Sequence, residues 1–226
     1  MAWYLGCTGR IRYIASQPFR QRFSTEVLTK HLSDCSISYM TTATGLRSTA
    51  EAQRARLTRA AIHVFAEKGY YATPVAEIAA EAGVSPAYVF RLFGDKLGLF
   101  IAAVRDTYAR VADTMATAGE ACATTEPEAK LSAMTHAYVA LIADRDLILM
   151  QSHAQTTSSI LAVRAAVQEG LAGVVAAVAD TSNAAPTEVQ RFIAYGQLCH
   201  LIVQADLAAV AQSWASTLTA GIEHTP

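Results

Sequence analysis

Apolar residues recur at helical spacing along most of this chain. The first clear stripe repeats at intervals of three and four residues and consists of Leu57, Ala61, Val64 and Phe65. Similar stretches continue to about residue 220. No run of alternating apolar and polar residues, the pattern of a half-buried strand, interrupts them. The periodicity therefore predicts an all-α fold.

Helix start and stop residues divide the region from 57 to 94 into three helices. Gly69 is expected to end the first helix, because glycine is the common residue just past a helix C-terminus. Thr73-Pro74 and Ser85-Pro86 each predict a new start, with a capping hydroxyl followed by a proline at the first helical position. Gly83 separates the second helix from the third, which closes at Gly94. Two short helices joined by a tight turn form a helix-turn-helix.

More helices are expected in the rest of the chain. Asp95 is a predicted cap for a long fourth helix, and another helix is expected to begin at Asp146. The other expected ranges are 127–143, 158–179, 187–205 and 207–220. The predicted architecture is an N-terminal three-helix helix-turn-helix domain followed by a helical bundle.

The first 39 residues differ from the remainder, because they mix aromatic and basic side chains without a lasting helical period. Our hypothesis is that Met40 is the natural start and that residues 1–39 are an upstream extension or a disordered arm. The alternative is a basic arm that follows DNA phosphates. The predicted domains are therefore residues 1–46 as an extension, 47–94 as the helix-turn-helix domain and 95–226 as the bundle.

Composition narrows the class of protein. The chain has 226 residues, of which 52% are hydrophobic and 16% charged, and this excludes a disordered chain. Four scattered cysteines do not form a disulfide framework or a CxxC metal site. The first residues lack the pattern of a secretory signal, and the apolar runs fall short of the ~20 residues that span a bilayer. A soluble, cytoplasmic protein is expected.

Charge is unevenly distributed. From residue 47 to 110 there are nine basic and six acidic residues, whereas beyond residue 110 four basic residues stand against eleven acidic ones. A basic segment joined to an acidic remainder suggests that one part of the chain meets a polyanion. Ordinary solvated surfaces could produce the same difference, so this pattern supports the interpretation only weakly.

Motifs of common enzymes are missing from the sequence. It contains no HExxH, GxSxG, P-loop or GxGxxG segment. His63 and Glu67 share a helix face, but His63 is expected to be a surface residue, and the other histidines lack partners at metal-ligand spacing. We therefore expect no catalytic residue, no metal site and no cofactor.

One segment resembles a known family. In the stretch 57–96, the blocks Ala-Ala-x-x-x-Phe-Ala-x-x-Gly, Ile-Ala-x-x-Ala-Gly-Val-Ser and Phe-x-x-Lys occur in order. This stretch resembles the N-terminal domain of TetR-type transcriptional regulators, over about residues 54–100. Phe90 and Leu92 depart from the commonest pattern, which has tyrosine and histidine or tyrosine there. Tyr88 or Arg91 is therefore expected to supply the phosphate contact instead.

The resemblance implies that the third helix enters the major groove of DNA. Arg91 is the only residue on that helix able to read guanine with two donors, and Val89, Phe90 and Phe93 are expected to pack inward. The expected DNA-binding residues are Arg54, Thr73, Ser85, Pro86, Ala87, Tyr88, Arg91 and Lys96. The alternative is that Tyr88 and Arg91 are ordinary solvated surface.

The resemblance also implies an effector site and a dimer interface in the second half. The expected effector pocket consists of Tyr108, Val111, Met115, Tyr138, Leu141, Met150 and His153, although such residues are more often plain core. The expected dimer interface consists of Phe192, Ile193, Gly196, Cys199, Ile202 and Val203, a stripe too wide for one neighbour. The alternative is that this stripe belongs to the monomer core.

These inferences predict a homodimeric DNA-binding transcriptional regulator, most simply a ligand-responsive repressor. Its expected partners are a pseudo-palindromic double-stranded DNA operator and a small-molecule effector, with no membrane. The alternative is an all-α ligand-binding protein or enzyme that no longer binds DNA. The sequence does not separate a repressor from an activator.

Overall fold

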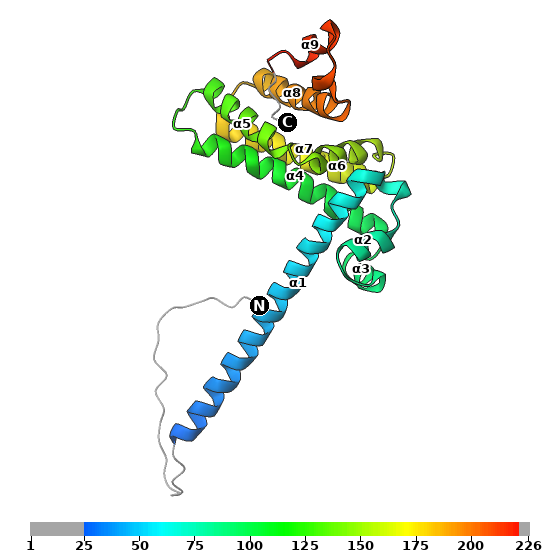
Figure 1. Ribbon diagram of the computed structural model, residues 1–226. Helices are drawn as coiled ribbons and strands as arrows, with labels where there is room; N and C mark the ends of the chain where they lie inside the picture. The colour runs from blue at the N-terminus through cyan, green and yellow to red at the C-terminus, as the bar shows by residue number, and fades with distance from the viewer. Residues whose placement is uncertain (1–24, 222–226) are drawn as a thin grey trace, which may run out of the picture. The chain divides into compact units, whose positions relative to one another are not determined.

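The computed structural model describes residues 25–221, and all regular structure in this range is helical (Figure 1). The predicted all-α fold is confirmed. The chain divides into two compact units, residues 1–48 and 49–226. The α-helices are α1 (Thr25–Ala72), α2 (Val75–Glu81), α3 (Pro86–Phe93), α4 (Lys96–Ala121), α5 (Pro127–Leu141), α6 (Arg145–Thr156), α7 (Leu161–Ser182), α8 (Pro186–Gln204) and α9 (Ser213–Thr219). A short 3-10 turn, η1 (Leu207–Ala209), precedes α9.

Helix α1 begins earlier than the sequence pattern suggested. Residues 25–46 are helical, and the assignment of residues 1–46 to an extension, disordered or upstream of the natural start, stays a prediction. No proline occurs between residues 25 and 73, so no residue of that kind forces a break in this stretch. Residues 1–24 lie outside the described residues. The hypothesis that Met40 is the natural start stays a prediction.

Gly69 interrupts α1, as the sequence predicted. Its φ of 73° and ψ of 176° fall in a region that essentially only glycine adopts, and the chain turns there before α2. The start of α2 differs from the prediction. Thr73 is buried and its hydroxyl donates to the Gly69 carbonyl at 2.7 Å, so it closes the turn behind it. The N-cap residue of α2 is Pro74, which makes no side-chain cap.

A compact core holds the helix-turn-helix together. Phe65 of α1 meets Phe100 of α4 edge to face, with ring centroids 4.9 Å apart, and both side chains are fully buried. Ile78 of α2 and Val89 of α3 are buried in the same cluster. The first turns of α4 are thus part of the core of the helix-turn-helix domain. Asp95 caps that helix as predicted, accepting a hydrogen bond from the Gly98 N–H at 2.7 Å.

The second half is a bundle in which α4 and α7 lie side by side (Figure 1). Close approach depends on Gly170 of α7, where an added Cβ would lie 2.5 Å from the Tyr108 ring of α4. On the outside of the same pair, Arg105 and Glu169 form an exposed ion pair at 2.9 Å. Helices α5, α6 and α8 pack around this pair.

Among residues 25–221, α7 alone is long and apolar enough to cross a bilayer by length and composition. Its valines at 163, 167, 174 and 178 are buried in the core, so this helix packs as part of the bundle. The outer face is also largely apolar, because it carries several exposed alanines and the exposed Val175. Helix α7 is therefore a core helix with an unusually apolar outer side.

Candidate nucleic-acid interface and effector cavity

Helix α3 begins with the two residues that the sequence marked as its start. Ser85 is the N-cap and its Oγ accepts from the Tyr88 N–H at 3.3 Å, while Pro86 takes the first helical position. Val89 is buried and anchors the helix to the core. The exposed residues of α3 are Pro86, Ala87, Phe90 and Arg91.

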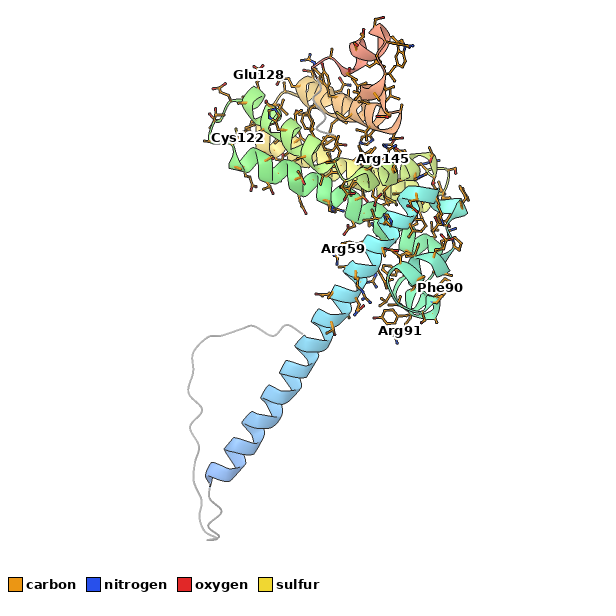
Figure 2. All side chains as sticks on the ribbon, viewed as in Figure 1. Arg59, Phe90, Arg91, Cys122, Glu128 and Arg145 are labelled. Atoms are coloured by element: carbon orange, nitrogen blue, oxygen red, sulfur yellow. The ribbon has the colours of Figure 1, made fainter. Side chains whose placement is uncertain are left out.

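Phe90 corrects one expectation. It was predicted to pack inward, but its side chain is 45% exposed. Each helical residue rotates the side chain by about 100°, so a helix buried through Val89 turns the next residue outward. Figure 2 shows Phe90 and Arg91 on the part of α3 that faces away from the bundle of α4 to α7. The outer face of α3 therefore presents an aromatic ring beside a guanidinium group.

Arg91 stacks on its neighbour one turn earlier. Its Cζ atom lies 4.6 Å from the centroid of the half-buried Tyr88 ring. Such a cation–π contact orients the guanidinium at little entropic cost. Arg91 is therefore exposed on α3 and held against the Tyr88 ring. Its guanidinium donors suit the acceptor edge of a guanine.

Arg54 and Lys96, two other predicted DNA contacts, are bound to their own chain. Arg54 donates to the Leu92 carbonyl at 2.7 Å and lies 4.7 Å above the Phe93 ring, so it fastens α3 to α1. Lys96 donates to a backbone carbonyl at 3.3 Å, and burial lowers the pKa of its ammonium group. Arg54 therefore positions α3, Lys96 ties the start of α4 to the end of α1, and contact of either side chain with DNA stays a prediction.

The interface also contains residues that the sequence reasoning missed. A groove beside the start of α3 is lined by Gln53, Arg56, Val84, Ser85 and Tyr88, among others. In it the Arg56 guanidinium donates to Gln53 Oε1 at 2.9 Å. Both residues lie on α1, three positions apart, and so share a polar helix face. This spacing could have identified them as interface residues from the sequence. Thr73, by contrast, keeps its hydroxyl in the interior and offers nothing to a phosphate.

A largely apolar cavity of about 50 Å³ lies within the bundle. Four of the predicted pocket residues line it, namely Tyr108, Val111, Met115 and Tyr138. The remaining lining residues are Thr135, Val139, Gln151, Leu171, Val174, Phe192, Ile193, Tyr195, Gly196, Gln197 and Cys199. The cavity is thus built from α4, α5, α6, α7 and α8.

Three predicted pocket residues lie elsewhere. Met150 is fully buried in the core, and Leu141 packs half-buried against it. The Nε2 atom of His153 lies 3.2 Å from the Ala66 carbonyl of α1, at hydrogen-bond distance. These residues share helix faces with true lining residues, so spacing alone could not separate them.

Most of the predicted dimer residues turn inward. Phe192, Ile193, Gly196 and Cys199 line the cavity, Ile202 is buried, and Val203 packs half-buried against the core. The apolar side chains that α8 exposes are instead Tyr195 and Leu201. Beside them, an apolar groove runs along α7 and α8, lined by Val175 and Val189 among others. The outer surface of these two helices is the candidate for a second copy of the chain.

The cavity wall contains a buried pair of ring side chains. The Tyr138 hydroxyl and His200 Nε2 lie 2.5 Å apart, and neither residue is more than 9% exposed. Burial lowers the pKa of His200 to about 4, so its imidazole is neutral at pH 7. Burial also raises the pKa of the Tyr138 and Tyr108 phenols, so both remain protonated.

A further polar contact joins α1 of the helix-turn-helix domain to α6 of the bundle. His63 Nδ1 of α1 lies 2.7 Å from the Asp146 carboxylate of α6. This hydrogen bond, with the charge of Asp146, raises the pKa of His63 above its usual value. In the part of the chain that the structure describes, no three histidine, cysteine or acidic side chains form a group that could hold a metal ion.

The comparison with protein families agrees with the helix-turn-helix. Residues 57–103 match the family described as bacterial regulatory proteins, tetR family. The HTH-type transcriptional regulator BetI of Rhizobium meliloti (strain 1021) is 38% identical over 82 residues, which cover 36% of this chain and 39% of that protein. HbdR of Aromatoleum sp. (strain CIB), also an HTH-type transcriptional regulator, is 43% identical over 61 residues, covering 26% of this chain and 27% of that protein. The chain thus matches less than two-fifths of each relative's length.

A solved structure extends the likeness to the bundle. The transcriptional regulator FadR of Bacillus subtilis, solved in complex with stearoyl-CoA, superposes with a TM-score of 0.57 at 22% sequence identity. The superposition covers 74% of this chain and 98% of that one. At this identity the likeness establishes the fold: an N-terminal helix-turn-helix followed by a helical C-terminal domain.

Proposed function

We propose that the chain, whose residues 57–103 match the tetR family of bacterial regulatory proteins, is a ligand-responsive transcriptional repressor. It would act in the cytoplasm as a homodimer on a pseudo-palindromic operator. The observation that supports this most strongly is the outer face of α3, where Arg91 stacks on Tyr88 beside an exposed Phe90. A helix anchored by buried residues and exposed on one side is what the major groove accepts.

Recognition would combine three kinds of contact. Arg91 would donate two hydrogen bonds to a guanine, and Ala87 and Phe90 would meet apolar groups at neighbouring base edges. The N-terminus of α3 and the arginine of the α1 groove, Arg56, would bind phosphates. Two copies of α3, about 34–36 Å apart in the dimer, would occupy successive major grooves.

The effector would act through the bundle. Helix α6 carries Gln151 into the cavity and, on the same helix, Asp146 and His153 contact α1 of the DNA-binding domain. A ligand that shifts α6 would therefore move α1 and change the position of α3. The coupling required is typically 1–3 kcal/mol. FadR of Bacillus subtilis, which shares this fold, binds stearoyl-CoA, so a bundle of this kind can hold a ligand.

Selection of bound sequences from random duplex DNA tests the function directly. We expect the full chain to enrich a pseudo-palindrome whose affinity falls steeply as salt rises from 50 to 200 mM. Arg91→Ala should abolish the sequence preference and leave the dimer intact. Arg145→Ala, which removes an exposed arginine on α6 outside the proposed DNA and dimer surfaces, is the matched control and should change neither.

Three outcomes would count against the proposal. Failure to enrich any sequence would favour the alternative, an all-α ligand-binding protein that no longer binds DNA. An unchanged sequence preference in Arg91→Ala would remove this arginine from base recognition. A gain in reporter transcription on binding, rather than a loss, would identify an activator.

A further inference from the structure

The cavity contains no group that could neutralise a charge. None of its fifteen lining residues is lysine, arginine, histidine, aspartate or glutamate. The nearby His200 carries no charge either, because burial lowers its pKa to about 4. Placing an ionised group in such surroundings without a partner is strongly unfavourable. An occupant of this cavity is therefore uncharged in the part that enters it.

The cavity wall nevertheless has an unused hydrogen-bond donor. Tyr108 is only 2% exposed, lines the cavity, and its hydroxyl has no hydrogen-bond partner. The Gln155 amide lies close enough to oppose the rise in the phenol pKa that burial causes, but no hydrogen bond joins the two side chains. An orphaned buried hydroxyl costs about 1–3 kcal/mol, so native proteins rarely keep one without a use.

The second phenol leads to the same conclusion. Neutral His200 carries one N–H and Tyr138 one O–H, and the 2.5 Å contact between them uses one of these hydrogens. Either the Tyr138 hydroxyl or His200 Nδ1 is then left with a hydrogen to donate, and Nδ1 has no partner. This pair therefore has one hydrogen left for a further acceptor, and the Tyr108 hydroxyl has another.

We infer, on the basis of the proposed regulator, that its effector is an uncharged, mainly apolar molecule bearing a carbonyl oxygen. The Tyr108 hydroxyl donates a hydrogen bond to this oxygen. The apolar remainder packs against Val111, Met115 and Phe192, which are among the apolar residues of the wall. The exposed lining residues, such as Tyr195 and Gln197, mark the mouth through which a tail longer than the 50 Å³ cavity would extend.

Calorimetric titration of the full chain with three eight-carbon probes tests this inference. The probes are 2-octanone, octanoate and octylamine, which share a chain and differ in their polar end. At pH 7 we expect 2-octanone to bind at least tenfold more tightly than either charged probe. Octanoate or octylamine binding as tightly as the ketone would overturn the inference, as would absence of 2-octanone binding at millimolar concentration.

Two variants test whether the Tyr108 hydroxyl donates the hydrogen bond to the ligand. Tyr108→Phe keeps the ring and removes only the hydroxyl, so it should weaken 2-octanone binding roughly tenfold. Its thermal midpoint should be unchanged or higher, because the lost hydroxyl has no partner in the free protein. Tyr71→Phe, at an exposed tyrosine of α1 that does not line the cavity, should change the affinity less than twofold. Equal affinities of Tyr108→Phe and the parent chain would overturn the role of Tyr108.

The two proposals fail separately. A chain that selects an operator but does not bind 2-octanone refutes the ligand class and leaves the regulator intact. A chain that binds 2-octanone through Tyr108 but selects no DNA refutes the regulator and leaves the ligand class intact. Release of the selected operator by 2-octanone, lost in Tyr108→Phe, would support both.

Discussion

At the scale of single residues, His200 carries a specific consequence for acid stability. Its ring is buried, and it titrates at about 4 in the folded chain against 6.5 for an ordinary histidine. Between these two pH values the unfolded chain binds a proton that the folded chain does not. The free energy of unfolding therefore decreases as the pH falls through this window. The contribution of the neutral His200 to that free energy is fully present above about pH 6.5.

This leads to a measurable pH dependence. The shift of His200 alone should lower the free energy of unfolding by about 2 kcal/mol between pH 7 and pH 5. In His200→Gln, urea unfolding should show a decline that is smaller by about this amount. His136→Gln, which changes an exposed histidine on α5, should keep the parent's dependence on pH. A parent-like decline in His200→Gln would mean that other groups cause it.

Residue-level roles were only partly predictable from the sequence. Ser85 and Asp95 were identified as caps because their chemistry acts within one turn of the chain. Thr73 has the same kind of side chain, yet its hydroxyl donates backward to Gly69, an outcome set by the positive φ of that glycine. Phe90 was misplaced because its neighbours, not its own hydrophobicity, decide which side of α3 is buried.

At the scale of elements, the contact between α4 and α7 depends on a missing side chain. Gly170→Ala should destabilise the chain by about 1–3 kcal/mol, because the new methyl group would overlap the Tyr108 ring. Gly173→Ala lies one turn later on the same helix and meets nothing within 4 Å. That control should be stabilised by up to about 1 kcal/mol. Chemical denaturation measures both, and a neutral Gly170→Ala would show that the helices can separate.

The ends of the helices could be predicted from residues close to them in sequence. The neighbours that each helix packs against could not. Prolines and glycines located α2, α3, α5 and α8 to within a few residues, because these residues act on the backbone where they stand. Which face of α8 points to the cavity depends on α5 and α6, which are far away in sequence. The inward placement of Phe192 and Cys199 was therefore beyond reach of helical spacing alone.

At the scale of the whole molecule, the proposed dimer requires that the outer surface of α7 and α8 bind a second copy of the chain. The double variant Tyr195→Glu/Leu201→Glu places two charges on exposed apolar sites and should convert the dimer to a monomer. Operator affinity should then fall by at least tenfold, since one α3 helix would bind one half-site. Sedimentation and DNA titration measure these two effects.

The control for this experiment is another exposed leucine. Leu161, at the start of α7, is 74% exposed and lies outside the apolar groove of α7 and α8. Leu161→Glu should remain dimeric with parent-like DNA affinity. If the double variant also stayed dimeric, the second copy would have to dock on a different surface.

The exposed ring of Phe90 has a consequence for epigenetic marking of the operator. An apolar side chain in the major groove meets the C5-methyl group of thymine and makes no distinction by hydrogen bonding there. A 5-methylcytosine presents the same methyl group at the same place. Enzymatic methylation of a cytosine under Phe90 should therefore tighten binding, and competition between methylated and unmethylated duplexes would measure how strongly the regulator senses that mark.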